Sequence, residues 1–312
     1  MNKFYMLIGL PGSGKSTIAK NMVKKDKNIE IFSSDKLRAE LWGSEDIQGD
    51  NTVLFNELHS RIKKCIKDGR DCIYDATNIS ANRRKAFLDE IKKYKVKKIC
   101  IFALTSLDKC KQNNNKRDRK VPEYVIENMY KTFDIPQYRE GWDNIIIKKY
   151  FDKKVDFEKD MNDMCYISHD NPHHNLTIGI HMCECARYIA TNYATKIDAN
   201  RLKILVEAAF FHDIGKVFCK QFKDMNGNET DIAHYYRHEN VSAYLYLLKY
   251  CGSKELSGKE LFSTLYVADL IYLHMRMFNL NTDKSKNKLI NKIGSTEYQD
   301  LCILHEADIL MA

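Results

Sequence analysis

The chain has 312 residues, of which 44% are hydrophobic and 29% are charged, and its formal net charge is +8. This length favours two domains of ordinary size, and no apolar run reaches the ~18 residues that a membrane span requires. Residues 1–8 run directly into a glycine-rich loop, so they are predicted to form a strand rather than an export signal. Ten cysteines without such a signal predict reduced thiols and a cytoplasmic protein.

Positive charge is concentrated in the first half of the chain. Residues 1–150 contain 31 Lys and Arg against 20 Asp and Glu, whereas residues 151–312 contain 19 against 22. A basic first half suits a polyanionic substrate, because neutralising phosphates releases their counterions. A lysine-rich, solvated surface explains the asymmetry equally well, so charge alone does not identify the substrate.

Residues 1–151 alternate apolar runs with amphipathic stretches, which predicts an α/β domain with a parallel, doubly wound sheet. The predicted strands are Phe4–Gly9, Ile29–Ser34, Cys72–Asp75, Lys98–Leu104 and Asn144–Tyr150. The predicted helices are Ser16–Lys25, Thr52–Lys67, Ala81–Lys93 and Glu123–Phe133, and Asn113, Asn114 and Asn115 are expected in a polar loop.

Residues 152–163 are charged and aperiodic and are predicted to be a linker, and residues 164–312 are predicted to form a second domain that is all-α. Its helices are expected at Leu176–Asn192, Ala199–Phe211, His238–Lys249, Leu256–Met275 and Gln299–Met311.

A phosphate-binding loop follows the first predicted strand. It fits G-x-x-x-x-G-K-[ST] and consists of Gly9, Leu10, Pro11, Gly12, Ser13, Gly14, Lys15 and Ser16, with Thr17 next. A strand before this pattern and a helix after it indicate nucleotide binding, because backbone N–H groups and the helix N-terminus surround the phosphates. Lys15 is expected to reach the β- and γ-phosphates of ATP or another nucleoside triphosphate, and Ser16 to bind Mg²⁺.

Charged side chains follow the second and third predicted strands, where ligands of such sheets bind. Asp35 is placed to accept the proton of an attacking hydroxyl, and Arg38 to bind a substrate phosphate; an N-cap Asp35 with a solvated Arg38 is the alternative. Asp75 ends the third strand and is predicted either to bind the metal or, as we favour, to orient Arg38 by an ion pair beside the substrate. Arg83 and Arg84 are further candidates for substrate contact, and a solvated helix face is the equal alternative.

A basic segment, residues 116–120, precedes Pro122 and a predicted helix. Small P-loop kinases have a lid at this place, where an arginine neutralises charge on the transferring phosphoryl group. A solvated run of charges is the alternative. Arg117 is predicted to contact the nucleotide and to be catalytic, and Arg119 competes with it for the role.

These motifs resemble the kinase domain of phage polynucleotide kinase and its bacterial relatives over about residues 1–145. The matching segments are residues 9–17, 34–38, 75–78 and the lid up to Val121-Pro122. The resemblance implies that Lys15 and Ser16 hold ATP and metal. It also implies that Asp35 is the general base, Arg38 a phosphate ligand and Arg117 the catalytic lid arginine. The first arginine that the family's lid often carries is missing here.

The second half of the chain contains nine of the ten histidines. His212 and Asp213 end an apolar predicted helix, His181 lies near the start of an earlier helix, and Asp308 lies close to residue 312. Three helices could bring these four side chains to one ion. Imidazole and carboxylate ligands suit Mn²⁺, Fe²⁺, Ni²⁺, Co²⁺ or Zn²⁺, and such an ion activates water for attack on a phosphoester. The helix of Asp308 is expected to be unusually short.

Residues 165–312 resemble the HD phosphohydrolase superfamily, and in detail the HD domains attached to nucleotidyltransferases. The matching segments are residues 171–174 with His181, residues 212–216, residues 238–242 and residues 270–275. The resemblance assigns His181, His212, Asp213 and Asp308 as metal ligands. His238 and His274 extend the set to a second metal or hold the scissile phosphate, and His174 is a candidate for substrate contact. Cys183 and Cys185 are expected to be small buried side chains on a helix.

A 5′-OH kinase joined to a phosphoesterase resembles bacterial end-healing proteins. Broken RNA commonly ends in a 2′,3′-cyclic phosphate and a 5′-OH, and a ligase needs both ends repaired. We therefore expect ATP-dependent phosphorylation of 5′-OH ends of RNA or DNA, hydrolysis of 2′,3′-cyclic phosphate or 3′-phosphate ends, and a separate ligase. The alternatives are a small-molecule or nucleoside kinase fused to an HD nucleotidase, and a nucleotide-gated regulatory module. The intact Lys15, Asp35 and His212-Asp213 argue against the regulatory module.

Overall fold

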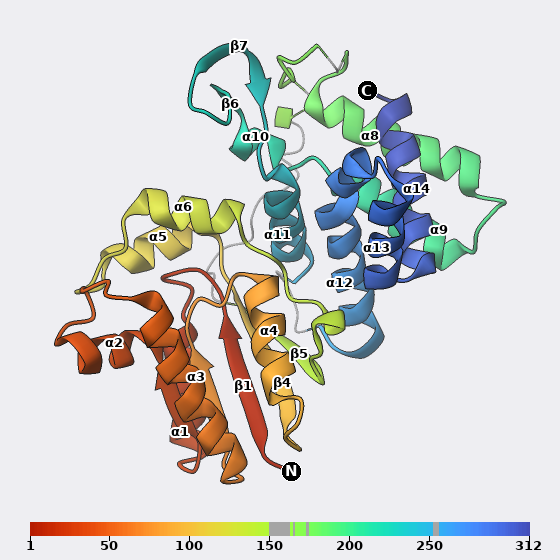
Figure 1. Cartoon of the computed structure of the whole chain (residues 1–312). Coiled ribbons are helices and arrows are strands. Elements are labelled where there is room, and N and C mark those ends of the chain that lie inside the picture. The colour runs from red at the N-terminus through yellow and green to blue at the C-terminus, as the bar shows by residue number, and fades with distance from the viewer. Residues whose placement is uncertain (150–162, 165, 173–174, 252–255) are drawn as a thin grey trace. The chain divides into compact units, whose positions relative to one another are not determined.

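The structure, a computed structural model, describes residues 1–149, 163–164, 166–172, 175–251 and 256–312 (Figure 1). It divides into two compact units, residues 1–153 and 154–312. The predicted linker lies outside the described residues except for Asp163. Across the described part of the chain, no helix is both long enough and apolar enough to cross a membrane.

The first unit is built on a five-stranded parallel sheet, as the alternation of strands and helices predicted. Its strands are β1 (Lys3–Ile8), β2 (Glu30–Ser33), β3 (Cys72–Asp75), β4 (Lys97–Leu104) and β5 (Asn144–Lys149), arranged in the order β2-β3-β1-β4-β5. Every pairing is parallel, so the carboxyl ends of all the strands lie along one edge. The phosphate-binding loop, Asp35 and Asp75 all follow or end strands at that edge.

Helices connect these strands. They are α1 (Lys15–Lys25), α2 (Ser34–Trp42), α3 (Asn51–Lys67), α4 (Ala81–Ile91), α5 (Leu107–Asn115), α6 (Glu123–Lys131) and the short 3₁₀ helix η1 (Tyr138–Glu140). The sequence did not predict α2, and the polar loop expected at residues 113–115 is instead the end of α5. Both helices have a serine N-cap, since Ser33 and Ser106 accept hydrogen bonds from backbone N–H groups three residues later.

One face of the sheet packs against α1. The buried cluster there comprises Leu7, Ile18, Ala19, Ile29, Ile73, Ile99, Ile101 and Ala103. Fully burying a Leu or Ile side chain contributes about 1.5–3 kcal/mol. This packing fixes β1 against α1 and therefore fixes both ends of the loop that joins them.

The second unit is mainly helical. Its helices are α8 (Ile178–Tyr193), α9 (Ala199–Phe211), α10 (Lys216–Cys219), α11 (His238–Tyr250), α12 (Gly258–Leu273), η2 (His274–Asn279), α13 (Asp283–Ile293) and α14 (Ser295–Leu310). The all-α prediction missed an antiparallel pair, β6 (Gln221–Lys223) and β7 (Glu229–His234). These strands are too short for a clear alternating pattern, and their turn contains Gly227 at a φ of 87°.

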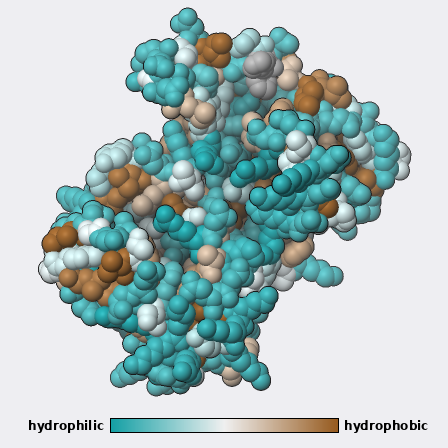
Figure 2. All heavy atoms as spheres, in the orientation of Figure 1, coloured by the Kyte–Doolittle hydropathy of each residue, from teal (hydrophilic) through white to brown (hydrophobic). Residues whose placement is uncertain are grey.

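The expectation of a short final helix was wrong. Helix α14 has 16 residues, and Asp308 lies in its last turn. It begins directly after Gly294, whose φ of 92° favours glycine, so the helix extends upstream of the apolar pattern that was used to predict it. The face of the molecule in Figure 2 is mostly hydrophilic, with hydrophobic side chains in small groups.

Candidate functional sites

The phosphate-binding loop has the form that nucleotide binding requires. Gly12 has a φ of 77°, and a Cβ atom there would lie 2.2 Å from the carbonyl oxygen of Cys110, so only glycine fits. Lys15 Nζ donates hydrogen bonds to the carbonyl oxygens of Gly9 at 2.9 Å and Leu10 at 2.7 Å. Burial lowers the pKa of Lys15. The ammonium is thus held inside the loop, at the position where phosphate oxygens bind.

Asp75 faces this loop rather than Arg38. Its carboxylate accepts a hydrogen bond from the Ser16 hydroxyl and interacts electrostatically with Lys15, although burial keeps its pKa raised. No ion pair joins Asp75 to Arg38 among the described residues, so the interpretation we favoured was wrong. The register explains this, because Asp75 pairs with Leu7, two residues before the loop begins. Asp75 therefore lies beside Ser16 and Lys15 of the phosphate-binding loop, and the other interpretation, that it binds the metal, stays a prediction.

Asp35 lies opposite both candidate lid arginines. Its carboxylate is 2.5 Å from Arg119 Nη1 and 3.7 Å from Arg117 Nη2. Arg119 Nε also lies 3.4 Å from Asp46. A hollow of about 600 Å³ beside these groups is lined by Ser44, Glu45, Asp46, Lys116, Arg117, Asp118 and Arg119. The lid and the start of α2 therefore form one charged surface next to the phosphate loop.

Arg38 is buried and only partly satisfied. Its Nη1 donates to the carbonyl oxygen of Gln48 at 3.3 Å, and its guanidinium lies 6.0 Å from the Trp42 ring. Its Nε atom has no hydrogen-bond partner among the described residues. A buried donor without a partner is costly in a folded protein, so an anionic ligand is the natural partner for this side chain.

The asparagines that the sequence placed in a loop hold the lid. Asn114 is buried and makes two hydrogen bonds with the backbone of Val121, donating to its oxygen at 2.8 Å and accepting from its nitrogen at 2.9 Å. Asn113 donates to the carbonyl oxygen of Gly12 at 2.9 Å. These contacts join the two ends of the arginine-bearing segment and attach it to the phosphate loop. Spacing alone could not reveal them, since the partners are backbone atoms.

Of the two arginines at the start of α4, only Arg83 remains a candidate for substrate contact. Arg83 is exposed, whereas Arg84 is 1% exposed and forms a bidentate pair with Glu140, with two N···O distances of 2.7 Å. Arg84 also donates to the carbonyl oxygens of Asn78 and Ile79. It therefore stabilises the fold of the first unit.

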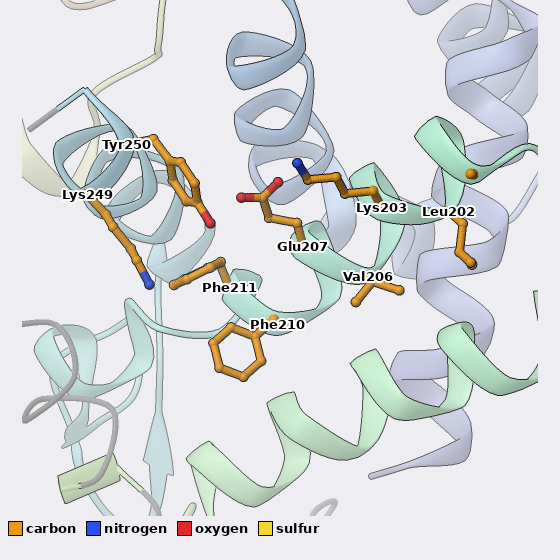
Figure 3. A pocket seen from close by; sticks show the side chains of 9 residues that line it. Leu202, Lys203, Val206, Glu207, Phe210, Phe211, Lys249 and Tyr250 are labelled. Atoms are coloured by element: carbon orange, nitrogen blue, oxygen red, sulfur yellow. The ribbon is translucent and has the colours of Figure 1, made fainter. Parts of the chain in front are cut away.

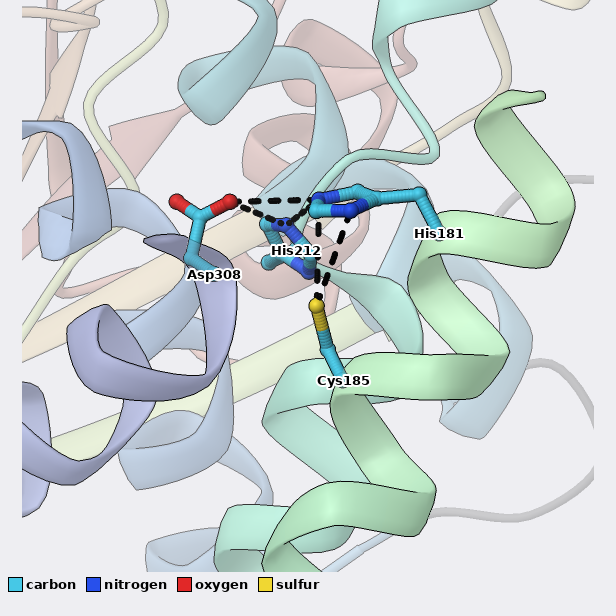
Figure 4. Close-up of side chains that lie close together, drawn as sticks. All are labelled: His181, Cys185, His212 and Asp308. Carbon is cyan, nitrogen blue, oxygen red and sulfur yellow. Dashed lines mark hydrogen bonds and ion pairs between the residues drawn. The ribbon is translucent and has the colours of Figure 1, made fainter. Parts of the chain in front are cut away.

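In the second unit, helices α8, α9 and α14 bring His181, His212 and Asp308 together (Figure 4). The Nε2 atoms of His181 and His212 are 3.2 Å apart. Asp308 Oδ1 lies 3.1 Å from His181 Nε2 and 3.5 Å from His212 Nε2. All three side chains are buried. A compact, buried set of imidazole and carboxylate groups is the donor set that divalent transition metals prefer.

Asp213, His238 and His274 form an adjacent group. Asp213 Oδ1 is 3.1 Å from His238 Nε2 and 3.8 Å from His274 Nε2, and these two nitrogens are 3.2 Å apart. Asp213 Oδ2 faces the first group, 3.5 Å from His181 and 3.3 Å from His212. The Asp213 carboxylate thus lies between two sets of candidate ligands, which we call together the histidine cluster.

The second nitrogen of each ring shows that the histidine cluster fits metal ions. Every Nδ1 lies 2.6–3.0 Å from a backbone carbonyl oxygen, in His181, His212, His238 and His274. Carbonyl oxygens only accept, so each Nδ1 carries a proton and Nε2 is the ring atom left to bind a metal. Two Nε2 atoms 3.2 Å apart require a shared proton or a cation between them. Such backbone anchoring is typical of metal-binding histidines.

The buried carboxylates of Asp213 and Asp308 require positive charge nearby. Burial raises the pKa of Asp213, but His212 and Lys216 outweigh it and hold that pKa well below the usual range. Burial lowers the pKa of His212, yet Asp213 and Asp308 raise it overall to about 10. Asp213 Oδ2 is buried and has no hydrogen-bond partner of ordinary geometry among the described residues, although Lys216 Nζ is 2.6 Å away.

One of the two nearby cysteines differs from the prediction. Cys183 is exposed, because it lies on the opposite side of α8 from the core. Cys185 is buried as expected, but its Sγ lies 3.8 Å from His181 Nε2, inside the first group of ligands (Figure 4). Burial raises the pKa of its thiol. His174 lies outside the described residues, so its role in substrate contact stays a prediction.

A separate hollow of about 460 Å³ lies against α9 and α11 (Figure 3). It is lined by Ala199, Leu202, Lys203, Val206, Glu207, Phe210, Phe211, Lys249 and Tyr250. The Tyr250 hydroxyl and the Glu207 carboxylate interact by a hydrogen bond, and Lys249 lies 4.5 Å from the Phe211 ring. None of the predicted site residues lines this hollow.

Comparison with known proteins agrees with the phosphate-loop site. Residues 4–136 match the AAA_33 family model, described as an AAA domain. The first unit is a kinase-like P-loop domain. The chain is 28% identical over 251 residues to L-seryl-tRNA(Sec) kinase of Methanococcus maripaludis, covering 72% of this chain and 92% of that protein. That share of this chain exceeds the first unit, so the alignment continues into the second.

Two further proteins resemble a smaller part of the chain. The bifunctional polynucleotide phosphatase/kinase of Schizosaccharomyces pombe is 21% identical over 145 residues, covering 45% of this chain but only 32% of that protein. A chain in the structure of the Pnkp1/Rnl/Hen1 RNA repair complex is 19% identical, with a TM-score of 0.39, and the match covers 42% of this chain and 43% of that one.

Proposed function

We propose that this chain is a bifunctional nucleic-acid end-healing enzyme. Its kinase unit phosphorylates 5′-OH ends of RNA or DNA with ATP, and its second unit is an HD phosphohydrolase that removes 2′,3′-cyclic phosphate or 3′-phosphate ends. The observation that carries the proposal is that one chain contains two separate clusters of residues suited to phosphate chemistry. One is Asp35 with its arginines beside the phosphate loop, and the other is the histidine cluster.

In the kinase unit, Lys15 and Ser16 hold the nucleotide and its Mg²⁺, with Asp75 beside them. The acceptor hydroxyl gives its proton to Asp35, so Asp35 must first separate from Arg119, which lies 2.5 Å away. Arg38, with its unpartnered Nε, binds a phosphate of the acceptor strand. The hollow at the lid has equal numbers of acidic and basic lining residues, so the support for a phosphate-bearing acceptor comes from Arg38 and not from the hollow.

In the second unit, His181, His212, Asp213 and Asp308 would hold one divalent transition metal, and His238 and His274 with Asp213 would hold a second. Bound there, such a metal supplies Lewis acidity toward a phosphoester and lowers the pKa of water toward ~7. The protein keeps each Nε2 free for the metal through the backbone bonds of Nδ1. Lys216 lies beside Asp213 and adds positive charge that favours an anionic substrate.

A second candidate function concerns the kinase acceptor. The relative from Methanococcus maripaludis is named for phosphorylation of a seryl group on tRNA, and the match covers 92% of it. A serine hydroxyl joined to tRNA offers Asp35 the same proton and offers the arginines the same phosphates. This candidate leaves the histidine cluster without a role, which is why we favour end healing.

Both candidates are tested with the full chain, ATP, Mg²⁺ and a transition metal. One substrate is an oligoribonucleotide with a 2′,3′-cyclic phosphate and a 5′-OH; the others are seryl-tRNA and a panel of nucleosides. End analysis should show a new 5′-phosphate and loss of the cyclic phosphate on the oligonucleotide. Phosphorylation of seryl-tRNA or a nucleoside, with the oligonucleotide unchanged at both ends, contradicts the proposal. A healed product still requires a separate ligase for sealing.

A further inference from the structure

Cys185 lies one helical turn after His181 on α8, on the side that faces the histidine cluster (Figure 4). Its Sγ atom is buried and lies 3.8 Å from both ring nitrogens of His181. One ligand atom from each of His181, Cys185, His212 and Asp308 lies within 4.8 Å of all the others. A fourth candidate donor therefore stands beside the first group, and it is a sulfur.

The distances among His181 Nε2, His212 Nε2 and Asp308 Oδ1 match those around one tetrahedral ion. Cys185 Sγ has the right distance to His181 Nε2 but is equally far from Nδ1, so its side chain must rotate toward the ion to bind it. A metal about 2.3 Å from sulfur and about 2.0–2.1 Å from nitrogen holds these two ligands roughly 3.6 Å apart and two nitrogens roughly 3.3 Å apart. The observed separations are 3.8 Å for Cys185 Sγ to His181 Nε2 and 3.2 Å for His181 Nε2 to His212 Nε2. The two distances from Asp308 Oδ1, 3.1 and 3.5 Å, lie in the same range.

We propose that the Cys185 thiolate is a ligand of the first metal and makes this position selective for a thiophilic ion such as Zn²⁺, Fe²⁺ or Co²⁺ over Mn²⁺ and Mg²⁺. The inference rests on the proposed metal-dependent function of the histidine cluster. On binding, the S–H bond breaks, the proton passes to solvent and a sulfur–metal bond forms. Thiolate ligands favour such ions, whereas sites built only from oxygen suit Mg²⁺ and Mn²⁺.

The position of Asp213 is consistent with this role. Its Oδ1 faces His238 at 3.1 Å and its Oδ2 faces His181 and His212, so it can bridge two ions. With Cys185, the first ion has four ligands even when Asp213 serves mainly the second. The competing role for the thiol is structural, since Sγ also lies 3.5 Å from the carbonyl oxygen of Ala307 and can donate to it.

The test is a Co²⁺ titration of the metal-free full chain, followed by absorption spectroscopy. Thiolate–Co²⁺ bonds give an intense near-ultraviolet charge-transfer band that nitrogen and oxygen ligands lack. We expect this band in the wild type and in Cys183→Ser, a matched control with an exposed thiol two residues away. We expect its loss in Cys185→Ser, which preserves the side-chain volume. Zn²⁺ affinity should fall by at least about 10–100-fold in Cys185→Ser, the loss typical of removing even an indirect partner of a ligand.

His212→Ala, which lacks a ligand of the proposed metal, is the reference that distinguishes failure of this inference from failure of the proposed function. Co²⁺ bound with ligand-field bands but no thiolate band, equally in wild type and Cys185→Ser, overturns the role of Cys185 and leaves the metal site standing. If the wild type binds no more Co²⁺ than His212→Ala, the metal function itself fails. Loss of the band in Cys183→Ser as well would assign it to another thiol and overturn the inference.

Discussion

The phosphate-loop site and the histidine cluster differ in how the chain holds their side chains. In the first, Asp35 and Arg117 are 36% and 37% exposed and reach the site from a helix start and a lid. In the second, His181 and His212 are fully buried within helices, and each Nδ1 is anchored by a carbonyl oxygen. The kinase site must therefore rearrange around its two substrates, whereas the histidine cluster is assembled before any ligand arrives.

The lid arginines give the largest effect on the kinase side. We expect Arg117→Ala to lower kcat for 5′ phosphorylation by about 10³–10⁵-fold, because a lid arginine neutralises the transferring phosphoryl group. Arg119→Ala should cost less, since Arg119 pairs with Asp35 and Asp46. Single-turnover kinetics of both variants, with Lys120→Ala as control, measures this. A larger loss of kcat in Arg119→Ala than in Arg117→Ala would assign the catalytic role to Arg119 instead of Arg117.

The next prediction concerns Asp35, the exposed residue that we propose as the general base. Asp35→Asn should lower kcat by about 10²–10⁴-fold and leave ATP affinity unchanged, because Lys15 and Ser16 hold the nucleotide. Glu40→Gln removes a carboxylate from the same helix on its exposed side and is the control. Near-wild-type turnover of Asp35→Asn at saturating oligonucleotide would exclude Asp35 as the base.

The structural role of the buried Arg84–Glu140 ion pair can be tested by measuring the stability of the kinase unit. Arg84→Met leaves the buried Glu140 carboxylate without its charged partner, although Gln137 N and Trp142 Nε1 still donate to it. The loss should lower the free energy of unfolding by about 3–5 kcal/mol. Both tryptophans, Trp42 and Trp142, belong to this unit, so their fluorescence during denaturant unfolding reports on it alone. Arg83→Met, at an exposed position, should change stability by no more than about 0.5 kcal/mol. Equal effects of the two variants would contradict the structural role of Arg84.

The smallest effect on kcat is expected from Asn114, whose side chain joins the two ends of the lid. Asn114→Asp keeps the oxygen that accepts from Val121 N but loses the donor to Val121 O, at a cost of about 1–3 kcal/mol. We expect kcat to fall roughly 10-fold, because 1.4 kcal/mol corresponds to a tenfold rate change. Asn115→Asp, at an exposed position, is the control. An unchanged kcat in Asn114→Asp means that the lid is held by other contacts.

The sequence alone predicted the position of a residue correctly where that position depends only on the strand, loop or helix that contains the residue. The loop at residues 9–16 needs only a strand before it and a helix after it, and the parallel sheet follows from alternation. Asp75 was misjudged because its partner depends on strand register, which sets Leu7 opposite it. Asn114 was missed because its partner is the backbone of Val121. Cys185 was missed although it lies one helical turn after His181, because His212 and Asp308 come near it only when α8, α9 and α14 pack together.

The central claim is that one chain contains two independent phosphate-processing sites. The most direct test gives wild type, Lys15→Ala and His212→Ala an oligonucleotide with a 2′,3′-cyclic phosphate and a 5′-OH, with ATP and metal present. Circular dichroism and metal analysis of each protein control for folding and loading. We predict that Lys15→Ala loses only 5′ phosphorylation and that His212→Ala loses only hydrolysis of the cyclic phosphate, together with bound transition metal. A well-folded His212→Ala that retains full hydrolysis and its metal contradicts the account.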